Sequence, residues 1–280
     1  MTPAHDGRSP IEEPGFSYLP RAIAADEAEA LIAYFGSLHP IWEQRHRDGD
    51  HARSAGHARR LTRPVYWLGA WQFACLGYYA EPDHRTDRCV TAEPFPPVMQ
   101  GILERLEPML RQRHPEPDMP TLPNTCLINY YGREVGEGQP RDYARLRMHR
   151  DGEPGPVVMF NIGQAGRLEF LDPERSPEPE LAVWTRHRSV TVLSGPTYKD
   201  RLYHRVVQVR TGEDPAMHCT LPGFELRRVS VSFRHVSPEL ISDAADLPSP
   251  RRAKVRDYVT ELAEHSAHWA RQRDRFPTSP

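Results

Sequence analysis

In the second half of the chain, apolar and polar residues alternate, and this pattern constrains the fold more than any other feature of the sequence. From residue 125 onward, short alternating segments are separated by turns that contain Gly and Pro. Such alternation is typical of strands that bury one face. Eight closely spaced strands predict an antiparallel sandwich or barrel. The expected strands are TCLINYY (125–131), ARLRMHRD (144–151), VVMFNIG (157–163), RLEFLD (167–172), LAVWTRH (181–187), SVTVLSG (189–195), LYHRVVQV (202–209) and RRVSVSFRHV (227–236).

The residues before this region predict helices and a loose N-terminal end. Residues 1–15 are polar and rich in Pro and Gly, so we expect a flexible tail. The segment 15–38 predicts a short strand, a turn and a helix with Asp26 as its N-cap. Residues 98–113 carry apolar side chains at the spacing of an amphipathic helix. These helices are expected to flank the β region.

The end of the chain predicts one more helical element. Residues 249–276 are polar with spaced apolar side chains, which indicates a terminal helix packed on the outside. A length of 280 residues suits one large β-rich domain with helical additions. We therefore expect a mostly β fold with flanking helices (α+β), in which a domain at 16–240 is followed by a C-terminal helical extension at 241–280.

Charge and cysteine usage narrow the class of protein. The formal net charge is −2 and the sequence pI is about 6.7, so no global basic field attracts nucleic acid, although a local stripe can still be basic. The four cysteines form no CxxC pair, and no charged and apolar leader precedes residue 15. The apolar runs are shorter than the roughly 20 residues of a membrane span. We expect a soluble, cytoplasmic monomer.

A short HxD motif with a distant histidine is the first candidate site. His149 and Asp151 are two residues apart, so both side chains leave an extended backbone from one face. His204 follows several strands later, far enough for the chain to fold back and add a third ligand. Two imidazoles and one carboxylate on one side of a metal are the ligand set of non-haem Fe(II) oxygenases. A surface turn is the alternative, since HxD arises easily among 14 histidines.

Two further strands carry polar side chains on one face. Arg228, Ser230, Ser232 and Arg234 alternate with apolar residues, and Asn129 and Tyr131 do the same in the first strand. Inside a barrel such a face can line a cavity and bind a dicarboxylate through charge-assisted hydrogen bonds. A solvated edge face has the same pattern. The arginine pair therefore strengthens the metal hypothesis only in combination with the histidines.

Taken together, these motifs resemble the AlkB family of Fe(II)- and 2-oxoglutarate-dependent dioxygenases. The matching elements occur in the family's order, over roughly residues 16–237 and most strongly over 124–236. They are N-x-Y at Asn129 and Tyr131, H-x-D-x-E at His149, Asp151 and Glu153, the distal His204, and R-x5-R at Arg228 and Arg234. The resemblance implies a double-stranded β-helix (jelly-roll) core at about 121–237 and a lid region at about 55–97.

The resemblance also implies a role for each matched residue. His149, Asp151 and His204 would bind Fe(II), which would take 2-oxoglutarate and O2 as co-substrates. Arg228 with Tyr131 would bind the 5-carboxylate of 2-oxoglutarate, and Asn129 with Arg234 would lie near its 1-carboxylate. Ser230 departs from the Asn common in the family at this position, so no role is assigned to it.

AlkB-like proteins typically oxidise N-alkylated bases in DNA or RNA, releasing formaldehyde, succinate and CO2. Glu153 would accept a hydrogen bond from the exocyclic amino group of a base. The aromatic segment 66–79 coincides with the family's lid, where Trp71, Phe73 or Tyr78 could stack on a flipped base. Residues buried in a core would give the same aromatic-rich sequence.

The sequence leaves the substrate open. HARRLTR (57–63) is the candidate phosphate-binding stripe, and a solvated charged loop is its alternative. With few other clustered cations, the same iron site could act on a small molecule or a protein. A non-enzymatic binding module on the same scaffold is the third hypothesis, because a fold does not determine a function.

Overall fold

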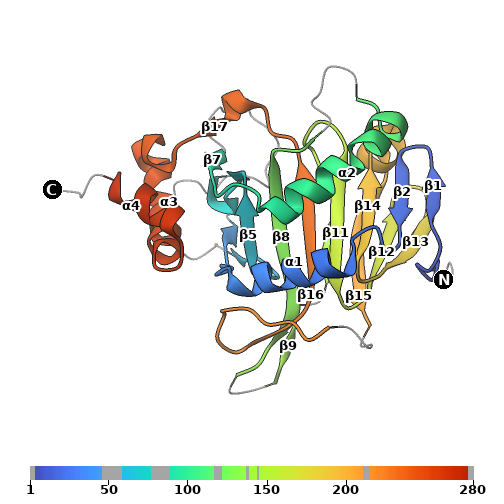
Figure 1. Ribbon diagram of the computed structural model, residues 1–280, viewed down its shortest axis with the longest axis horizontal. Helices are drawn as coiled ribbons and strands as arrows, with labels where there is room; N and C mark the ends of the chain where they lie inside the picture. The colour runs from blue at the N-terminus through green and yellow to red at the C-terminus, as the bar shows by residue number, and fades with distance from the viewer. Residues whose placement is uncertain are drawn as a thin grey trace.

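Two antiparallel sheets form the centre of the protein in the computed structural model (Figure 1). The structure describes residues 4–45, 59–76, 89–116, 122–136, 139–143, 145–210 and 215–276. The larger sheet runs in the order β1 (Ile11–Glu13), β2 (Phe16–Leu19), β14 (Ser189–Leu193), β11 (Val157–Gly163), β16 (Phe224–Arg234), β8 (Thr125–Glu134) and β5 (Val65–Leu68), with β9 (Arg141–Asp142) paired to β8. The smaller sheet runs β10 (Leu146–His149), β15 (Tyr203–Val209), β12 (Gly166–Leu171), β13 (Leu181–Thr185). All eight expected strands are confirmed.

The connections between these strands define a jelly roll. Along the chain, β8, β11, β14 and β16 join the larger sheet, while β10, β12, β13 and β15 join the smaller one. The chain thus crosses between the sheets repeatedly, which is the double-sheet arrangement of this fold. The expectation of a mostly β fold with a jelly-roll core and flanking helices is therefore correct.

The alternation of side chains builds two cores on opposite faces of the larger sheet. In β11, Val157 and Met159 face the smaller sheet and pack with Phe170, whereas Val158 and Phe160 belong to the outer cluster. The inner cluster is small, and polar side chains occupy the rest of the inner face. This division leaves a polar interior near the end of the roll where β10 and β15 meet.

Two helices cover the outer face of the larger sheet (Figure 1): α1 (Ala25–Ser37) and α2 (Pro97–Arg113). Both bury an apolar stripe in the outer core, as their sequence period predicts. The expected N-cap of the first helix is wrong. Ala24 is the N-cap, and the Glu27 carboxylate accepts a hydrogen bond of 2.7 Å from its backbone N–H.

The N-terminal residues are ordered by pairing, contrary to the expected flexible tail. From residue 4 onward, His5 bridges to Val183, and β1 pairs along its length with β2. Tyr18 of β2 is fully buried and donates a hydrogen bond to the carbonyl of Gly7. Pro and Gly in this segment therefore shape an edge of the sheet.

The aromatic segment and the C-terminal residues pack against each other. The segment contains β6 (Ala70–Trp71) and η1 (Ala74–Leu76), and the C-terminal residues form α3 (Ser249–Ala263) and α4 (Ala267–Asp274), two helices where one was expected. Trp71 and Phe73 have no exposed surface; the two rings stack at 4.7 Å, and Trp269 meets Trp71 edge to face at 5.4 Å. These contacts make the extension part of the outer core.

The remaining elements are short. They are β3 (Gln44–Arg45) paired with β4 (Arg59–Arg60), β7 (Cys89–Thr91) between β6 and β17 (Ile241–Ser242), η3 (Pro238–Leu240), η4 (Ala244–Asp246) and a π-helical turn, η2 (Pro196–Arg201). Among the described residues, no helix combines the length and apolar composition needed to cross a membrane.

One carboxyl group is buried under the aromatic segment. Glu43 is 1% exposed, and its two oxygens accept hydrogen bonds from the indoles of Trp67 and Trp71 and from the backbone N–H of Ala74. Burial raises the pKa of Glu43 to about 7, although these donors oppose the shift.

Because Glu43 is buried, we expect it to make the free energy of unfolding depend on pH, and Glu43→Gln should remove this dependence. Between the ordinary pKa of 4.5 and about 7, the folded protein holds a proton that the unfolded chain has released, so stability falls as pH rises. Relative to the variant, the wild type should lose about 3 kcal/mol from pH 4.5 to pH 8. Urea unfolding of both proteins across this range measures the difference, and parallel pH profiles would contradict the prediction.

Candidate metal centre and co-substrate site

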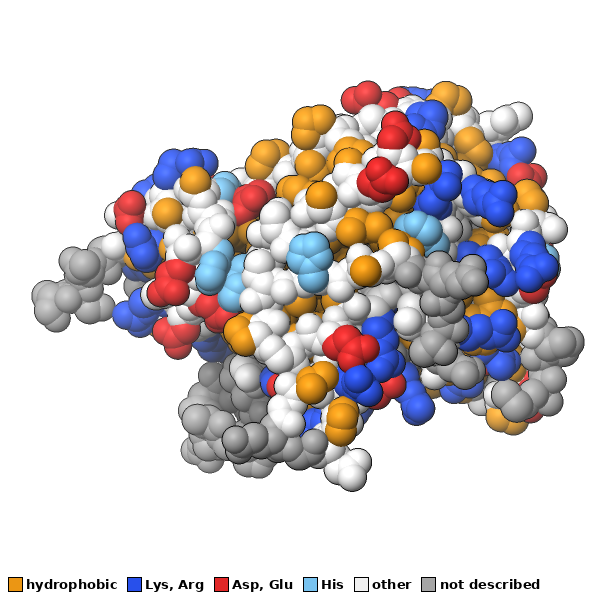
Figure 2. All heavy atoms as spheres, turned by 60° about the horizontal axis from the view of Figure 1, so that its bottom comes forward, with side chains coloured by type: hydrophobic (Ala, Val, Ile, Leu, Met, Phe, Trp, Pro, Cys, Tyr) orange, Lys and Arg blue, Asp and Glu red, His pale blue; other side chains and the backbone are white. Residues whose placement is uncertain are grey.

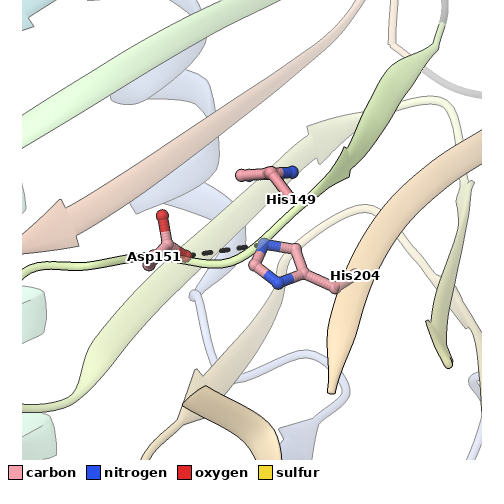
Figure 3. Close-up of side chains that lie close together, drawn as sticks. All are labelled: His149, Asp151 and His204. Carbon is pink, nitrogen blue, oxygen red and sulfur yellow. Dashed lines mark ion pairs between the residues drawn. The ribbon is translucent and has the colours of Figure 1, made fainter. Parts of the chain in front are cut away.

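Three side chains converge where β10 and β15 meet (Figure 3). His149 ends β10 and lies directly opposite His204 of β15 in the strand register, with ring centroids 4.2 Å apart. Asp151 follows two residues after His149, and its carboxylate lies 3.5 Å from His204 Nε2. One ligand atom from each residue lies within 4.8 Å of the others. The predicted HxD…H cluster is therefore assembled as a possible metal site.

The protonation states in this cluster are those that metal ligands need. The Arg147 carbonyl accepts a hydrogen bond of 2.8 Å from His149 Nδ1, which leaves His149 Nε2 as the available lone pair. Burial lowers the pKa of His204 to about 3, with the neighbouring His149 adding to the effect, and burial also lowers the pKa of His149. Both imidazoles are thus neutral at physiological pH, as coordination requires.

Asp151 stays ionised because of its basic neighbour. It is 8% exposed, and burial alone would raise its pKa, but the neighbouring Arg234 guanidinium reverses this and holds the pKa below its usual range. Arg234 donates from both Nε, at 3.0 Å, and Nη2 to Asp151 Oδ1. The other oxygen, Oδ2, faces His204. One oxygen is therefore held by the arginine while the other points into the cluster.

Lys199 supports the loop that carries Asp151, a role that sequence reasoning missed. Lys199 lies in the π-helical turn η2, and its side chain is buried. Its Nζ donates hydrogen bonds to the carbonyls of Glu153 and Gly155, and the bond to Gly155 is 2.8 Å long. Lys199 is one of only two lysines among 36 basic residues, which was the one signal available in the sequence. Its two hydrogen bonds fix the turn between the metal ligands and β11.

Glu153 lies beside this centre. Its carboxylate is 3.4 Å from Arg234 Nε, and its side chain is 11% exposed. Arg234 therefore links the carboxylates of Asp151 and Glu153. The H-x-D-x-E motif thus places both acids against the same arginine.

The arginines predicted to bind the co-substrate have other partners. Arg228 stands opposite Tyr131 in the register, but its Nη1 and Nη2 donate to the carbonyls of Gln164 and Thr185, to Thr185 Oγ1 and to Asn161 Oδ1. Asn129 lies opposite Ser230, whose carbonyl accepts a hydrogen bond of 3.3 Å from its amide. The predicted residues thus share the inner face, and their assignment to the two carboxylates of 2-oxoglutarate stays a prediction.

Arg63 lies beside Asn129 in this site, although its sequence context predicts a phosphate-binding stripe. It was expected in a phosphate stripe, yet it is 5% exposed and donates from Nε to Asn129 Oδ1 at 2.6 Å. Arg60 of the same stripe pairs with Glu134 at 3.0 Å and stacks on Trp42. The stripe is therefore wrong for Arg63, which is buried, whereas Arg60 is exposed and its assignment stays a prediction. Residues 57 and 58 and the Arg59 side chain lie outside the described part. Figure 2 shows basic and acidic side chains mixed on the face it presents.

The expected lid residues are not at the metal centre. Trp71 and Phe73 are buried between the sheet and the C-terminal helices, so neither ring can stack on a substrate, and this prediction is wrong. Tyr78 lies outside the described residues. A buried core segment and a substrate-binding lid can have the same aromatic-rich sequence. The helices that cover Trp71 and Phe73 are nearly 200 residues away in the sequence, so the local sequence could not distinguish the two cases.

Comparison with known proteins now defines the class. The family model described as the 2OG-Fe(II) oxygenase superfamily matches residues 15–234. The chain belongs to this superfamily, and the enzyme is accordingly an oxygenase that uses Fe(II), 2-oxoglutarate and O2.

Similar solved structures include the two described below, whereas the search of curated proteins found no match. The structure of OsALKBH1 is 20% identical with a TM-score of 0.49, covering 80% of this chain and 100% of that chain. A crystal structure of an oxidoreductase of the 2OG-Fe(II) oxygenase family from Burkholderia pseudomallei is 16% identical with a TM-score of 0.44, covering 78% of this chain and 84% of that chain.

The described residues fit the superfamily's metal. Two neutral imidazoles and one ionised carboxylate on one side of a common point are the donor set that Fe(II) takes in these enzymes, with positions left for other ligands. His204 Nδ1 is buried without a hydrogen-bond partner, and Asp151 is already oriented by Arg234.

Proposed function

We propose that this oxygenase is an AlkB-like demethylase that oxidises N-alkyl groups of nucleobases in DNA or RNA. The observation that carries the proposal is the position of Glu153, whose carboxylate is held by Arg234 next to the metal ligand Asp151. A carboxylate there can accept a hydrogen bond from the exocyclic amino group of a base and orient its N-alkyl group toward the metal. The motif order from Asn129 to Arg234 supports the same family.

In this proposal the chain's residues bind and orient, and the bound groups supply the oxidation. His149, Asp151 and His204 would hold Fe(II). With 2-oxoglutarate and O2, the iron centre supplies the oxidation of a C–H bond, and the co-substrate becomes succinate and CO2. Arg234 keeps Asp151 ionised and oriented, and Lys199 fixes the turn that follows it. A hydroxylated N-methyl group then releases formaldehyde and leaves the bare amine.

A small molecule or a protein is the second candidate substrate. The arginines of the proposed phosphate stripe that the structure describes are committed elsewhere: Arg60 to Glu134 and Arg63 to Asn129. Phosphate contacts dominate nucleic-acid affinity, so the burial of Arg63, which leaves one cation fewer on this segment, favours a substrate without a phosphate backbone.

Formaldehyde release separates the two candidates. The wild type with Fe(II) and 2-oxoglutarate should release formaldehyde from single-stranded oligonucleotides with 1-methyladenine or 3-methylcytosine, in step with succinate. Glu153→Gln should retain iron binding and lose much of this activity, and His149→Ala should lose both. If no methylated DNA or RNA oligonucleotide is turned over while small molecules or peptides stimulate succinate formation, the second candidate replaces the first.

A further inference from the structure

The strand that ends at the first metal ligand also carries a run of basic residues. Residues 145–150 (RLRMHR) contain three arginines and no acidic residue, although the whole chain has a formal net charge of −2. The three arginines, Arg145, Arg147 and Arg150, are all exposed, and they flank His149 along the chain. The border of the metal centre is therefore basic on this strand.

A bulge in β10 turns two consecutive side chains of this run outward. Between Leu146 and His149, the pairing takes three steps along β10 for two steps along β15. Leu146 packs in the inner cluster and His149 faces the opposite ligand, whereas Arg147 and Met148 between them are both exposed. Bulges re-aim side chains and are frequent beside active sites. This bulge therefore presents a cation and an apolar side chain together, immediately before a metal ligand.

Met148 has an exposure that is rare in this protein. It is 41% exposed, and among the described residues Val135 is the only other large hydrophobic side chain with so much accessible surface. One exposed apolar side chain is ordinary by itself. Met148, however, lies between arginines and next to a metal ligand, and its unbranched, polarizable thioether can adapt to the face of a base. This combination fits a polyanion that carries apolar rings.

Arg150 is held at the surface by the neighbouring strand. Its Nη1 donates a hydrogen bond of 2.5 Å to the carbonyl of Asp200, and its guanidinium carbon lies 4.5 Å from the ring centroid of Tyr203. A carbonyl and a ring face orient the guanidinium group without neutralising it. Arg150 therefore remains a positively charged group in a fixed position.

The carboxylates around this run are matched by other cations. Asp151 and Glu153 both lie against Arg234. On the neighbouring strands, Glu169 pairs with Arg205 at 2.8 Å. These acids are thus balanced by arginines outside the run, and the positive charge of residues 145–150 faces solvent.

We propose that Arg145, Arg147, Met148 and Arg150, the β10 rim, bind a single nucleic-acid strand beside the metal centre. This inference rests on the proposed function and adds the surface that holds the strand. The arginines would pair with phosphate oxygens, which the guanidinium fork binds through two parallel hydrogen bonds. Met148 would pack against the base that neighbours the one turned toward the metal, where stacking has been lost. The rim would supply the phosphate contacts that the buried Arg63 cannot make.

The salt dependence of strand binding tests the three arginines without turnover. Affinity of the protein loaded with Mn(II) and 2-oxoglutarate for a labelled DNA strand of about 12 nucleotides is measured by fluorescence anisotropy between about 50 and 200 mM salt. R145Q, R147Q and R150Q should each weaken binding by about 3- to 10-fold at the lower salt concentration. Each should also reduce the slope of log K against log salt concentration by about 0.7, the value for one phosphate contact in a single strand.

The matched control is R111Q, which removes an exposed arginine of α2 that pairs with Glu107 on the outer side of the protein. It should change neither the affinity nor the slope. M148A should weaken binding by about 3- to 10-fold with an unchanged slope, because Met148 contacts a base and carries no charge.

Two results would overturn the proposal. If the arginine variants keep the wild-type affinity and slope, the strand binds elsewhere. If they weaken binding of polyglutamate as much as binding of DNA while M148A changes neither, the rim is a site for an acidic peptide.

Co(II) binding, followed by its absorption spectrum, shows whether each variant keeps the metal centre. The carbonyl of Arg147 accepts from His149, so if R147Q alone loses Co(II), R145Q and R150Q decide. Normal rim behaviour without turnover of any methylated strand would refute the proposed function alone. Turnover by a protein whose arginine variants bind DNA normally would refute the rim alone.

Discussion

Replacing His204 with alanine is expected to reduce 2-oxoglutarate turnover to succinate by more than about 100-fold. Residues that only orient a metal ligand already cost about 10- to 100-fold when changed, so loss of a ligand should exceed this range. His204 is buried opposite His149, and no other histidine, cysteine or acidic group among the described residues joins this cluster to replace it. Succinate release in the presence of Fe(II) and O2 measures the effect.

The matched control is His265→Ala, which removes an exposed histidine from the turn between α3 and α4. This variant should keep wild-type activity and wild-type binding of Co(II), followed by its absorption spectrum. The His204 variant should fold, because the substitution removes a neutral side chain, and should bind Co(II) weakly. Wild-type Co(II) affinity in His204→Ala would show that the metal lies elsewhere.

Replacing Arg234 with leucine is expected to destabilise the protein by about 3–5 kcal/mol at pH 7, because Asp151 then becomes a buried carboxylate without its main cation. Asp151 and Arg234 are 8% and 4% exposed, so water cannot take the place of the lost hydrogen bonds. Urea unfolding without metal measures the change.

A double variant separates the energy of the Asp151–Arg234 interaction from the effects of the individual residues. Asp151→Asn combined with Arg234→Leu removes both charges of the pair, and it should be more stable than Arg234→Leu alone, since position 151 no longer carries a buried charge. If the double variant is the less stable of the two, or if Arg234→Leu unfolds at the wild-type urea concentration, the buried pair does not have the energetic role assigned to it.

The β core and the metal cluster could be predicted from the sequence because both depend on local patterns. Alternating residues define each strand, and the two-residue spacing of His149 and Asp151 places them on one side. The resemblance to a family motif predicted His204 as the third ligand. The pairing of β10 with β15 brings His204 opposite His149.

The incorrect or missed assignments of Trp71, Phe73, Arg63 and Lys199 share one physical cause, which is contact between segments distant in sequence. Trp71 and Phe73 are buried because Trp269 and Tyr258 cover them, and no local pattern reports that contact. Arg63 looks like a surface cation in its own segment, and only its contact with Asn129 of β8 places it in the site. Lys199 likewise gains its role from carbonyls more than 40 residues away in the chain.

The placement of the two histidines on facing strands ties metal binding to the integrity of the smaller sheet. β10 is the outermost strand there, and its pairing with β15 is interrupted by an irregularity between Leu146 and His149. A metal coordinated by both imidazoles would act as a crosslink between these strands, where backbone hydrogen bonds are incomplete. A slip of one residue along β15 would turn His204 to the opposite face and dismantle the centre. Bound iron would therefore hold β10 and β15 in register in addition to its catalytic role, because the pairing of the edge strand and the assembly of the metal centre depend on each other.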